Sequence, residues 1–141
     1  KGIWYRPFSA EPYTGLHVRW YENGQLHIKS SYKNGKKEGL FEEWYKNGRP
    51  SEKGNYINGK QDGLHEIWEE NGQLSKKSSY KNGKKEGLFE AWWGNGKLAF
   101  KVNYIDGKKE GLFLHWDTQG NLGFPGCFKA GERADPSYCD I

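Results

Sequence analysis

Hydrophobic residues recur along this chain at a fixed interval, with polar turn residues between them. Residues 29–42 read KSSYKNGKKEGLFE, and residues 77–90 repeat the same letters. The two segments are 48 positions apart. The true period is half of this distance, because single residue types recur every 24 positions. The recurring columns are Leu16, Leu40, Leu64, Leu88 and Leu112; Trp20, Trp44, Trp68, Trp92 and Trp116; and Tyr32, Tyr56, Tyr80 and Tyr104. Such an interval is typical of a repeat protein in which each unit contacts its neighbours.

Each unit also contains two turn signals. Asn-Gly occurs at 23, 47, 71 and 95 and again at 34, 58 and 82, with Gln119-Gly120 and Asp106-Gly107 closing the two series. Asn-Gly and Asp-Gly supply the positive φ angles of two-residue hairpin turns, so the segments between them are predicted as antiparallel strands of about eight residues. No segment has helical periodicity.

These signals predict an all-β fold, a single-layer antiparallel β-meander of about five 24-residue repeats with two strands per repeat. The repeat array is expected over residues 15–126. An N-terminal partial repeat or cap is expected at residues 1–14, and a C-terminal cap with a cysteine pair at 127–141.

Two-residue loops determine which side chains share a face of this sheet. Around Asn47-Gly48, such a loop places Trp44 opposite Ser51 and Glu42 opposite Lys53. Residues opposite one another point to the same face of the sheet, and successive residues of a strand point to opposite faces. The Leu/Trp face carries the Leu and Trp columns together with Glu42, Glu66 and Glu90 opposite Lys53, Lys77 and Lys101. The Tyr/Gly face carries the Tyr column and Gly15, Gly39, Gly63, Gly87 and Gly111. A glycine opposite each tyrosine would leave room for the ring, and a bulge in KNGKKEG would break the register at one side of each repeat.

The unit Y-x-N-G-K-K-E-G-L-F…W-x-x-N-G-x-L resembles the bacterial variant of the MORN (membrane occupation and recognition nexus) repeat, as found in YwqK-type, antitoxin-like proteins. The opening Pro12-Tyr13-Thr14-Gly15 is similar to the usual first repeat of such chains. The resemblance implies a curved, single-layer β-meander that is used for binding. The residues after the array depart from the pattern and are expected to cap its exposed edge.

Composition argues against disorder, although hydrophobic residues make up only 34% of the chain. Phe, Trp and Tyr account for 16% of all residues, whereas disordered segments are poor in aromatic residues. The 22 basic and 18 acidic residues are interspersed, and a formal net charge of +4 is only a weak indication of an anionic partner. No apolar run approaches the roughly 18 residues that a membrane span requires.

The two cysteines, Cys127 and Cys139, lie close together near the C-terminus. They are expected to close a terminal loop as a disulfide in an oxidising compartment, and two reduced thiols are the alternative. The disulfide favours the bacterial periplasm or export, with anchoring to a membrane through a removed N-terminal segment, since the sequence begins at Lys1 rather than Met. The cytoplasm is the alternative location.

Catalytic and metal-binding patterns are poor. His115 with Cys127 and Cys139 gives three ligand types without the spacing of a metal site. His17 and His65 fall in the column that holds Phe in the other repeats, so these rings are expected to pack on the sheet. We therefore expect a non-enzymatic protein with no metal and no cofactor.

Positions that vary between repeats are the candidates for binding a partner. Aromatic residues and Arg concentrate the binding energy of protein interfaces, whereas the repeating Trp column is expected to stabilise the fold. An ordinary solvated sheet face is the alternative interpretation. The predicted partner-binding residues are Arg19, Tyr21, Tyr45, Ile67, Trp93, Phe100 and His115.

Three classes of function were compared with these patterns. The resemblance favours a protein-binding antitoxin or immunity protein that neutralises a toxin or secreted effector directly. The alternative is a membrane-surface or scaffold module, because anionic lipid headgroups would attract the lysine pairs at one edge of the sheet, Lys36-Lys37, Lys84-Lys85 and Lys108-Lys109. A nucleic-acid partner is not expected, because it would require a more basic face. The sequence identifies neither the partner nor the oligomeric state.

Overall fold

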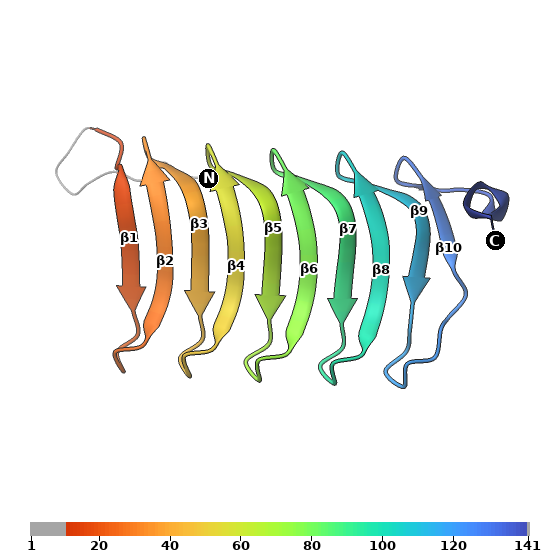
Figure 1. Cartoon of the computed structure of the whole chain (residues 1–141), viewed down its shortest axis with the longest axis horizontal. Helices are drawn as coiled ribbons and strands as arrows, with labels where there is room; N and C mark the ends of the chain where they lie inside the picture. The colour runs from red at the N-terminus through yellow and green to blue at the C-terminus, as the bar shows by residue number, and fades with distance from the viewer. Residues whose placement is uncertain (1–10, 141) are drawn as a thin grey trace.

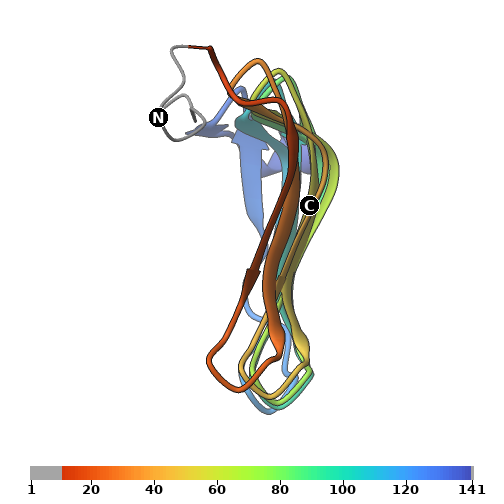
Figure 2. The ribbon, with the colours of Figure 1, turned by 90° about the vertical axis from the view of Figure 1, so that its left-hand side faces the viewer.

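One antiparallel sheet makes up almost all of the protein. The computed structural model describes residues 11–140, and its strands follow one another in the sheet in chain order. Figure 1 shows this meander, and Figure 2 shows that it is one layer thick and bowed along the strands. The strands are β1 (Gly15–Trp20), β2 (Leu26–Lys33), β3 (Lys36–Trp44), β4 (Pro50–Ile57), β5 (Lys60–Trp68), β6 (Leu74–Lys81), β7 (Lys84–Trp92), β8 (Leu98–Ile105), β9 (Lys108–His115), β10 (Gly126–Lys129) and β11 (Glu132–Arg133). The predicted all-β repeat meander is therefore confirmed, and a short 3-10 helix, η1 (Pro136–Cys139), is the one helical segment of residues 11–140.

The turns that precede each K-K-E-G segment have the predicted two-residue form. Asn34 has a φ of 50° and Gly35 a φ of 75°, while Lys33 pairs with Lys36 across the turn. Two positive φ angles in succession define the type I′ turn that Asn-Gly favours. The expected bulge follows directly, because the register of β2 and β3 shifts between the pairs Ser30–Phe41 and Tyr32–Lys37.

The turns at the opposite end of the strands differ from the prediction. Trp44 pairs with Pro50 rather than with Ser51, and the register shifts at this point. The Tyr45 amide donates to the Arg49 carbonyl at 2.8 Å, so the loop is longer than two residues. Asn47 is selected here for its side chain, whose Oδ1 accepts from the Arg49 amide at 3.0 Å. The shift is local, since Glu42 still pairs with Lys53 as predicted.

The recurring glycines are required by the backbone rather than by the tyrosine rings. Gly39 pairs with Tyr56 as predicted, but a β-carbon at Gly39 would meet nothing within 4 Å. Its φ of 81° is the reason for glycine, because this left-handed conformation is costly for residues with a β-carbon. The predicted packing explanation for this column is therefore wrong at Gly39, and Gly87, with a φ of 84° and equally open space, behaves in the same way.

The buried side chains gather on the Tyr/Gly face. Phe89, Ala91 and Val102 form a buried cluster against which Phe100 and Tyr104 pack. On the Leu/Trp face the exposed fractions are 62% for Trp20 and 54%, 45%, 46% and 49% for Leu16, Leu40, Leu64 and Leu88. The expectation that the Trp column forms the stabilising core is therefore wrong at Trp20, because the closest ring packing lies on the other side of the sheet.

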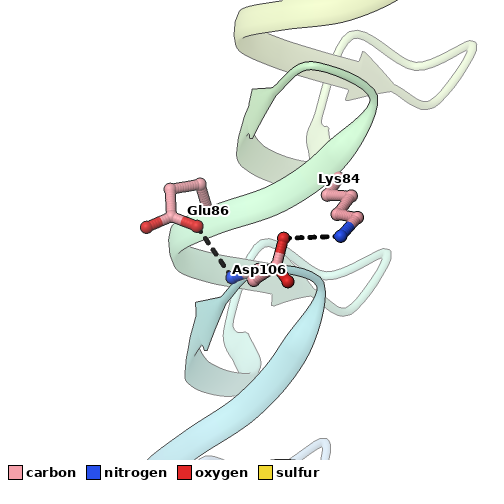
Figure 3. A network of polar contacts seen from close by, with 3 residues as sticks. All are labelled: Lys84, Glu86 and Asp106. Carbon is pink, nitrogen blue, oxygen red and sulfur yellow. Dashed lines mark hydrogen bonds and ion pairs between the residues drawn. The ribbon is translucent and has the colours of Figure 1, made fainter.

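Each type I′ turn is held by the repeat before it. Glu86 Oε2 accepts from the Asp106 amide at 2.8 Å, and Lys84 Nζ lies 2.7 Å from Asp106 Oδ1 (Figure 3). The same carboxylate contact joins Glu38 to the Asn58 amide, Asp62 to the Asn82 amide and Glu110 to the Ala130 amide. The acidic residue of K-K-E-G therefore links successive repeats.

The C-terminal helix η1 is fixed to β10 by a disulfide and to β9 by a hydrogen bond. Cys127 in β10 is joined to Cys139 in η1 by a disulfide, with 5.9 Å between their Cα atoms. The Tyr138 hydroxyl donates to Glu110 Oε1, which ties η1 to β9. Most of the expected N-terminal partial repeat at 1–14 lies outside the described residues, so that boundary stays a prediction.

Candidate functional site

Four of the predicted partner-binding residues share the Tyr/Gly face. Arg19 lies on β1, Ile67 on β5, Phe100 on β8 and His115 on β9, and the strand register turns all four to this side. Phe100 is directly opposite His115, and each ring centroid lies 5.7 Å from that of Phe113. The structure thus brings Phe100 and His115 together and leaves Arg19 and Ile67 on separate strands along the same face.

Tyr21, Tyr45 and Trp93 lie in turns rather than on strands. The Tyr45 hydroxyl donates to the Trp68 carbonyl at 2.7 Å. Tyr21 makes the same contact with the Trp44 carbonyl at 2.9 Å, and Trp93 Nε1 with the Trp116 carbonyl at 3.0 Å. Each of these side chains therefore bonds to the next repeat. These three variable positions therefore also have a structural role, and their role in binding stays a prediction.

Aromatic rings form a row along the Tyr/Gly face, in separate pairs from β3 to β6 and in unbroken contact from β7 to β10. Within the repeats, Phe41 contacts Tyr56 with centroids 6.0 Å apart, and His65 contacts Tyr80 at 5.6 Å. Towards the C-terminus Phe89 stacks on Phe100 at 5.4 Å. Phe113 then contacts Phe128 at 6.1 Å. The row extends from β3 to β10 and includes the predicted residue Phe100.

Lysines lie over this row. Lys37 Nζ is 3.9 Å from the centroid of the Phe41 ring and 4.8 Å from that of Tyr56, and Lys85 lies 4.0 Å from the Phe89 ring. Burial lowers the pKa of Lys37, while Glu52 and Glu43 act in the opposite direction. Sequence reasoning missed these cation–π contacts. The second lysine of K-K-E-G, which recurs at 37, 85 and 109, is the signal that indicates them.

Two histidine–carboxylate pairs also lie on the Tyr/Gly face. His65 is buried, and its Nε2 lies 2.8 Å from Glu52 Oε1. The His65 ring covers Gly54, where a β-carbon would come within 2.5 Å of it. His27 Nε2 lies 3.3 Å from Glu43 Oε1. The expectation that His65 packs in the Phe column agrees with this placement, but its acidic neighbour was not predicted.

The Leu/Trp face has a different chemistry. Lys and Glu alternate from strand to strand across its middle, and neighbouring residues pair directly, as Glu66 does with Lys53 and Lys77. We call this row the ladder, and it consists of Lys29, Glu42, Lys53, Glu66, Lys77, Glu90 and Lys101. The Lys53 and Glu42 charges lie 3.7 Å apart, and Lys53 is half exposed. The ladder is therefore a solvent-facing row of paired charges.

Two features were sought among the described residues, a cluster of metal ligands and a long apolar helix. Within residues 11–140 no group of three or more His, Cys, Asp or Glu side chains is placed to hold a metal ion. Both cysteines are held in the disulfide. No helix of the described residues is long and apolar enough to cross a membrane.

The periodic geometry agrees with a comparison of the sequence with known families. A family described as MORN repeat variant matches residues 13–34, 37–58, 61–82 and 85–106, which together cover more than half of the chain. The second of these segments begins in β3 and ends with the type I′ turn after β4, so it contains one strand pair. No curated protein matches the chain.

Proposed function

This chain belongs to the MORN repeat variant family, and on that premise we propose that it is a non-enzymatic protein-binding module whose Tyr/Gly face receives a protein partner. The observation that carries this proposal is the row of aromatic rings from β3 to β10. Within the described residues no second layer packs on it, so rings such as Phe100 and Tyr104 stay half-exposed, although the Lys85 ammonium lies 5.0 Å from the Tyr104 centroid. Rings with few rotatable bonds suit the centre of a protein interface.

The charges beside the row favour a protein over a nucleic acid. The face carries both signs of charge, because Glu43 and Glu52 interrupt a larger set of basic residues, which are Arg19, Lys37, Lys76, Lys85 and Lys109. Binding along a phosphate backbone requires a run of positive charge, whereas mixed charges give specificity between proteins. Ile67 adds an apolar contact beside the acidic pair, since it is opposite Glu52.

We further propose that the partner is a toxin or secreted effector, and that the chain acts as an antitoxin or immunity protein by covering the toxin's active site. The support is the resemblance of the repeat to antitoxin-like bacterial chains, together with an extended face that spans many strands. The disulfide between Cys127 and Cys139 supports an oxidising compartment such as the periplasm.

The proposal is tested by recovering a partner from the native cell with the intact, oxidised chain and measuring its affinity by calorimetry. Ile67→Ala and Arg19→Ala are expected to weaken binding by about tenfold or more, because truncation of an anchor residue costs roughly 2 kcal/mol. Tyr45→Ala is less informative, because it also removes the bond to the Trp68 carbonyl.

The matched control is Leu64→Ala, which removes a side chain from the opposite face of the strand that holds Ile67. It is expected to leave the affinity unchanged. Equal loss with Leu64→Ala, or unchanged affinity with both Ile67→Ala and Arg19→Ala in folded protein, would contradict the assignment of the face. Binding to anionic vesicles that falls steeply with salt would instead favour the membrane alternative.

A further inference from the structure

The Leu/Trp face combines exposed apolar side chains with charges in a regular order. Leu40, Leu64 and Leu88 are each about half exposed, and Trp20 is 62% exposed. Half-exposed leucines recur at one-repeat spacing along this face and alternate with Ser or Asn of the strands between them. Exposed apolar side chains gathered on one face of a monomer mark an interaction surface. From this face we propose that two copies of the chain pack face to face as a dimer, with a twofold axis parallel to the strands.

The ladder determines the symmetry of this dimer. A twofold axis along the repeats would place every ladder residue over its own copy, so that Lys meets Lys and Glu meets Glu. An axis parallel to the strands reverses the order of the ladder. If it passes between β5 and β6, Glu66 lies over Lys77 of the second copy and Lys53 over Glu90 of the second copy. Opposite charges then meet from Glu42 to Lys101, whereas Lys29 lies over Leu114 of the second copy.

The same axis also matches large residues with small ones. In the leucine row, Ser or Asn of β2, β4, β6 and β8 is directly opposite Leu16, Leu40, Leu64 and Leu88 of β1, β3, β5 and β7. In the tryptophan row, Leu or Pro is opposite Trp20, Trp44, Trp68 and Trp92. An axis between β5 and β6 exchanges odd with even strands. Leu64 therefore lies over Ser79 of the second copy, and Leu88 over Asn55 of the second copy. The leucine side chains of the two copies therefore interdigitate, as closely packed interfaces require.

The size of the face fits a stable dimer. The strands from β1 to β9 span eight intervals, and at about 4.8 Å for each interval this gives a length of roughly 38 Å. The Leu and Trp rows are four residues apart, so the width with side chains included is about 20 Å at a rise of roughly 3.3 Å per residue. The product is roughly 800 Å² per copy, which is the area of a standard specific interface. An axis between β5 and β6 also keeps β1 to β10 overlapped.

The test measures molar mass by light scattering across a concentration series of the intact, oxidised chain. The wild type is expected to form a dimer of twice the 16.3 kDa chain mass. Leu64→Glu places a charge in the apolar row, and Glu66→Lys places Lys over Lys77 of the second copy. Each is expected to raise the dimer dissociation constant by at least about tenfold, because like charges opposite one another in an interface are strongly unfavourable.

A mixing experiment tests the axis itself. Chains with Glu66→Lys and chains with Lys77→Glu each place like charges together in their own dimers. Mixed in equal amounts they restore both opposite pairs, so a heterodimer is expected. The control Phe124→Glu alters an apolar side chain that is 95% exposed in the loop after β9 and belongs to neither the leucine row nor the ladder, and it should leave the dimer intact. Circular dichroism and a melt verify that each variant is folded.

A wild-type chain that stays monomeric to millimolar concentration would overturn the proposal. So would a dimer that Leu64→Glu leaves unchanged in folded protein, or two single variants that do not combine. Ile67→Ala, on the opposite face, is expected to leave the dimer unchanged. Failure of the dimer is therefore separate from failure of partner binding at the Tyr/Gly face.

Discussion

The sharpest prediction for the fold compares two neighbouring residues of β7 that point to opposite faces. Phe89 is 7% exposed on the Tyr/Gly face, whereas Leu88 is 49% exposed on the Leu/Trp face. Phe89→Ala and Leu88→Ala each remove one large apolar side chain from the same strand. If the buried core lies on the Tyr/Gly face, the first substitution destabilises the protein far more than the second.

The contacts of Phe89 determine the expected cost. Returning a buried phenylalanine to water costs roughly 2 kcal/mol. Its ring also stacks on Phe100 and lies edge-on to Tyr104, contacts that contribute about 1 kcal/mol together. The Lys85 ammonium, 4.0 Å above the ring, contributes roughly 0.5–1 kcal/mol more. The expected loss for Phe89→Ala is therefore about 4 kcal/mol, within the usual range of roughly 3–5 kcal/mol.

Leu88→Ala is expected to cost only about 1 kcal/mol, because half of the side chain is already in contact with water. The measurement is urea unfolding followed by far-ultraviolet circular dichroism under oxidising conditions, with the slope of the transition compared between variants. A Leu88→Ala loss as large as that of Phe89→Ala would show that the Leu/Trp face holds the core, and would refute the reasoning.

Three further predictions concern the backbone, the disulfide and pH. Gly87→Ala is expected to lower stability by about 1–2 kcal/mol, because Gly87 has a φ of 84°, whereas Gly94→Ala, at a glycine with open space and no positive φ, should change it by less than about 0.5 kcal/mol in the same thermal melts. Cys139→Ser, or reduction of the wild type, is expected to cost about 3 kcal/mol in melts with and without reductant, because the bond closes a short loop. Hydrogen bonds from the Tyr138 hydroxyl and the Ala130 amide hold the pKa of Glu110 below its usual value of 4.5. The ionised Glu110 carboxylate therefore stabilises the fold above pH 4.5, and this stabilisation is lost as the pH falls through the lower pKa of the folded state. Melts across acid pH should therefore show a smaller acid-dependent loss for Glu110→Gln than for the wild type.

Local chemistry was enough to predict the strands and half of the turns. Asn34-Gly35 forms a type I′ turn because Asn and Gly both tolerate the positive φ angles that this turn requires. Asn47-Gly48 carries the same dipeptide but forms a longer loop. There the Asn47 amide group donates to the Glu70 carbonyl of the next repeat at 3.1 Å, a contact that no local pattern contains.

The two faces were separated correctly by alternation, but the buried one was not identified. A single layer has no opposing layer, so burial depends on rings lying against one another within one face. The stack of Phe89 on Phe100 depends on the way in which β7 pairs with β8. For the site, a two-residue turn at Asp106-Gly107 would place Phe100 opposite Phe113, and the register shift between Lys101 and Asn103 places it opposite His115 instead. The approach of His65 to Glu52 depends on side-chain rotamers, which a repeat pattern does not specify.

The contacts between repeats have a direction, and this has a consequence for synthesis. Glu86 accepts from the Asp106 amide, and Tyr45 donates to the Trp68 carbonyl. In both contacts the side chain belongs to the earlier repeat and the backbone group to the later one. The ribosome releases the N-terminal repeats first. Each emerging hairpin therefore meets a preceding repeat whose carboxylate and hydroxyl groups are already in place. The sheet can lengthen one hairpin at a time as translation proceeds, and the disulfide of Cys139 is the last link to close.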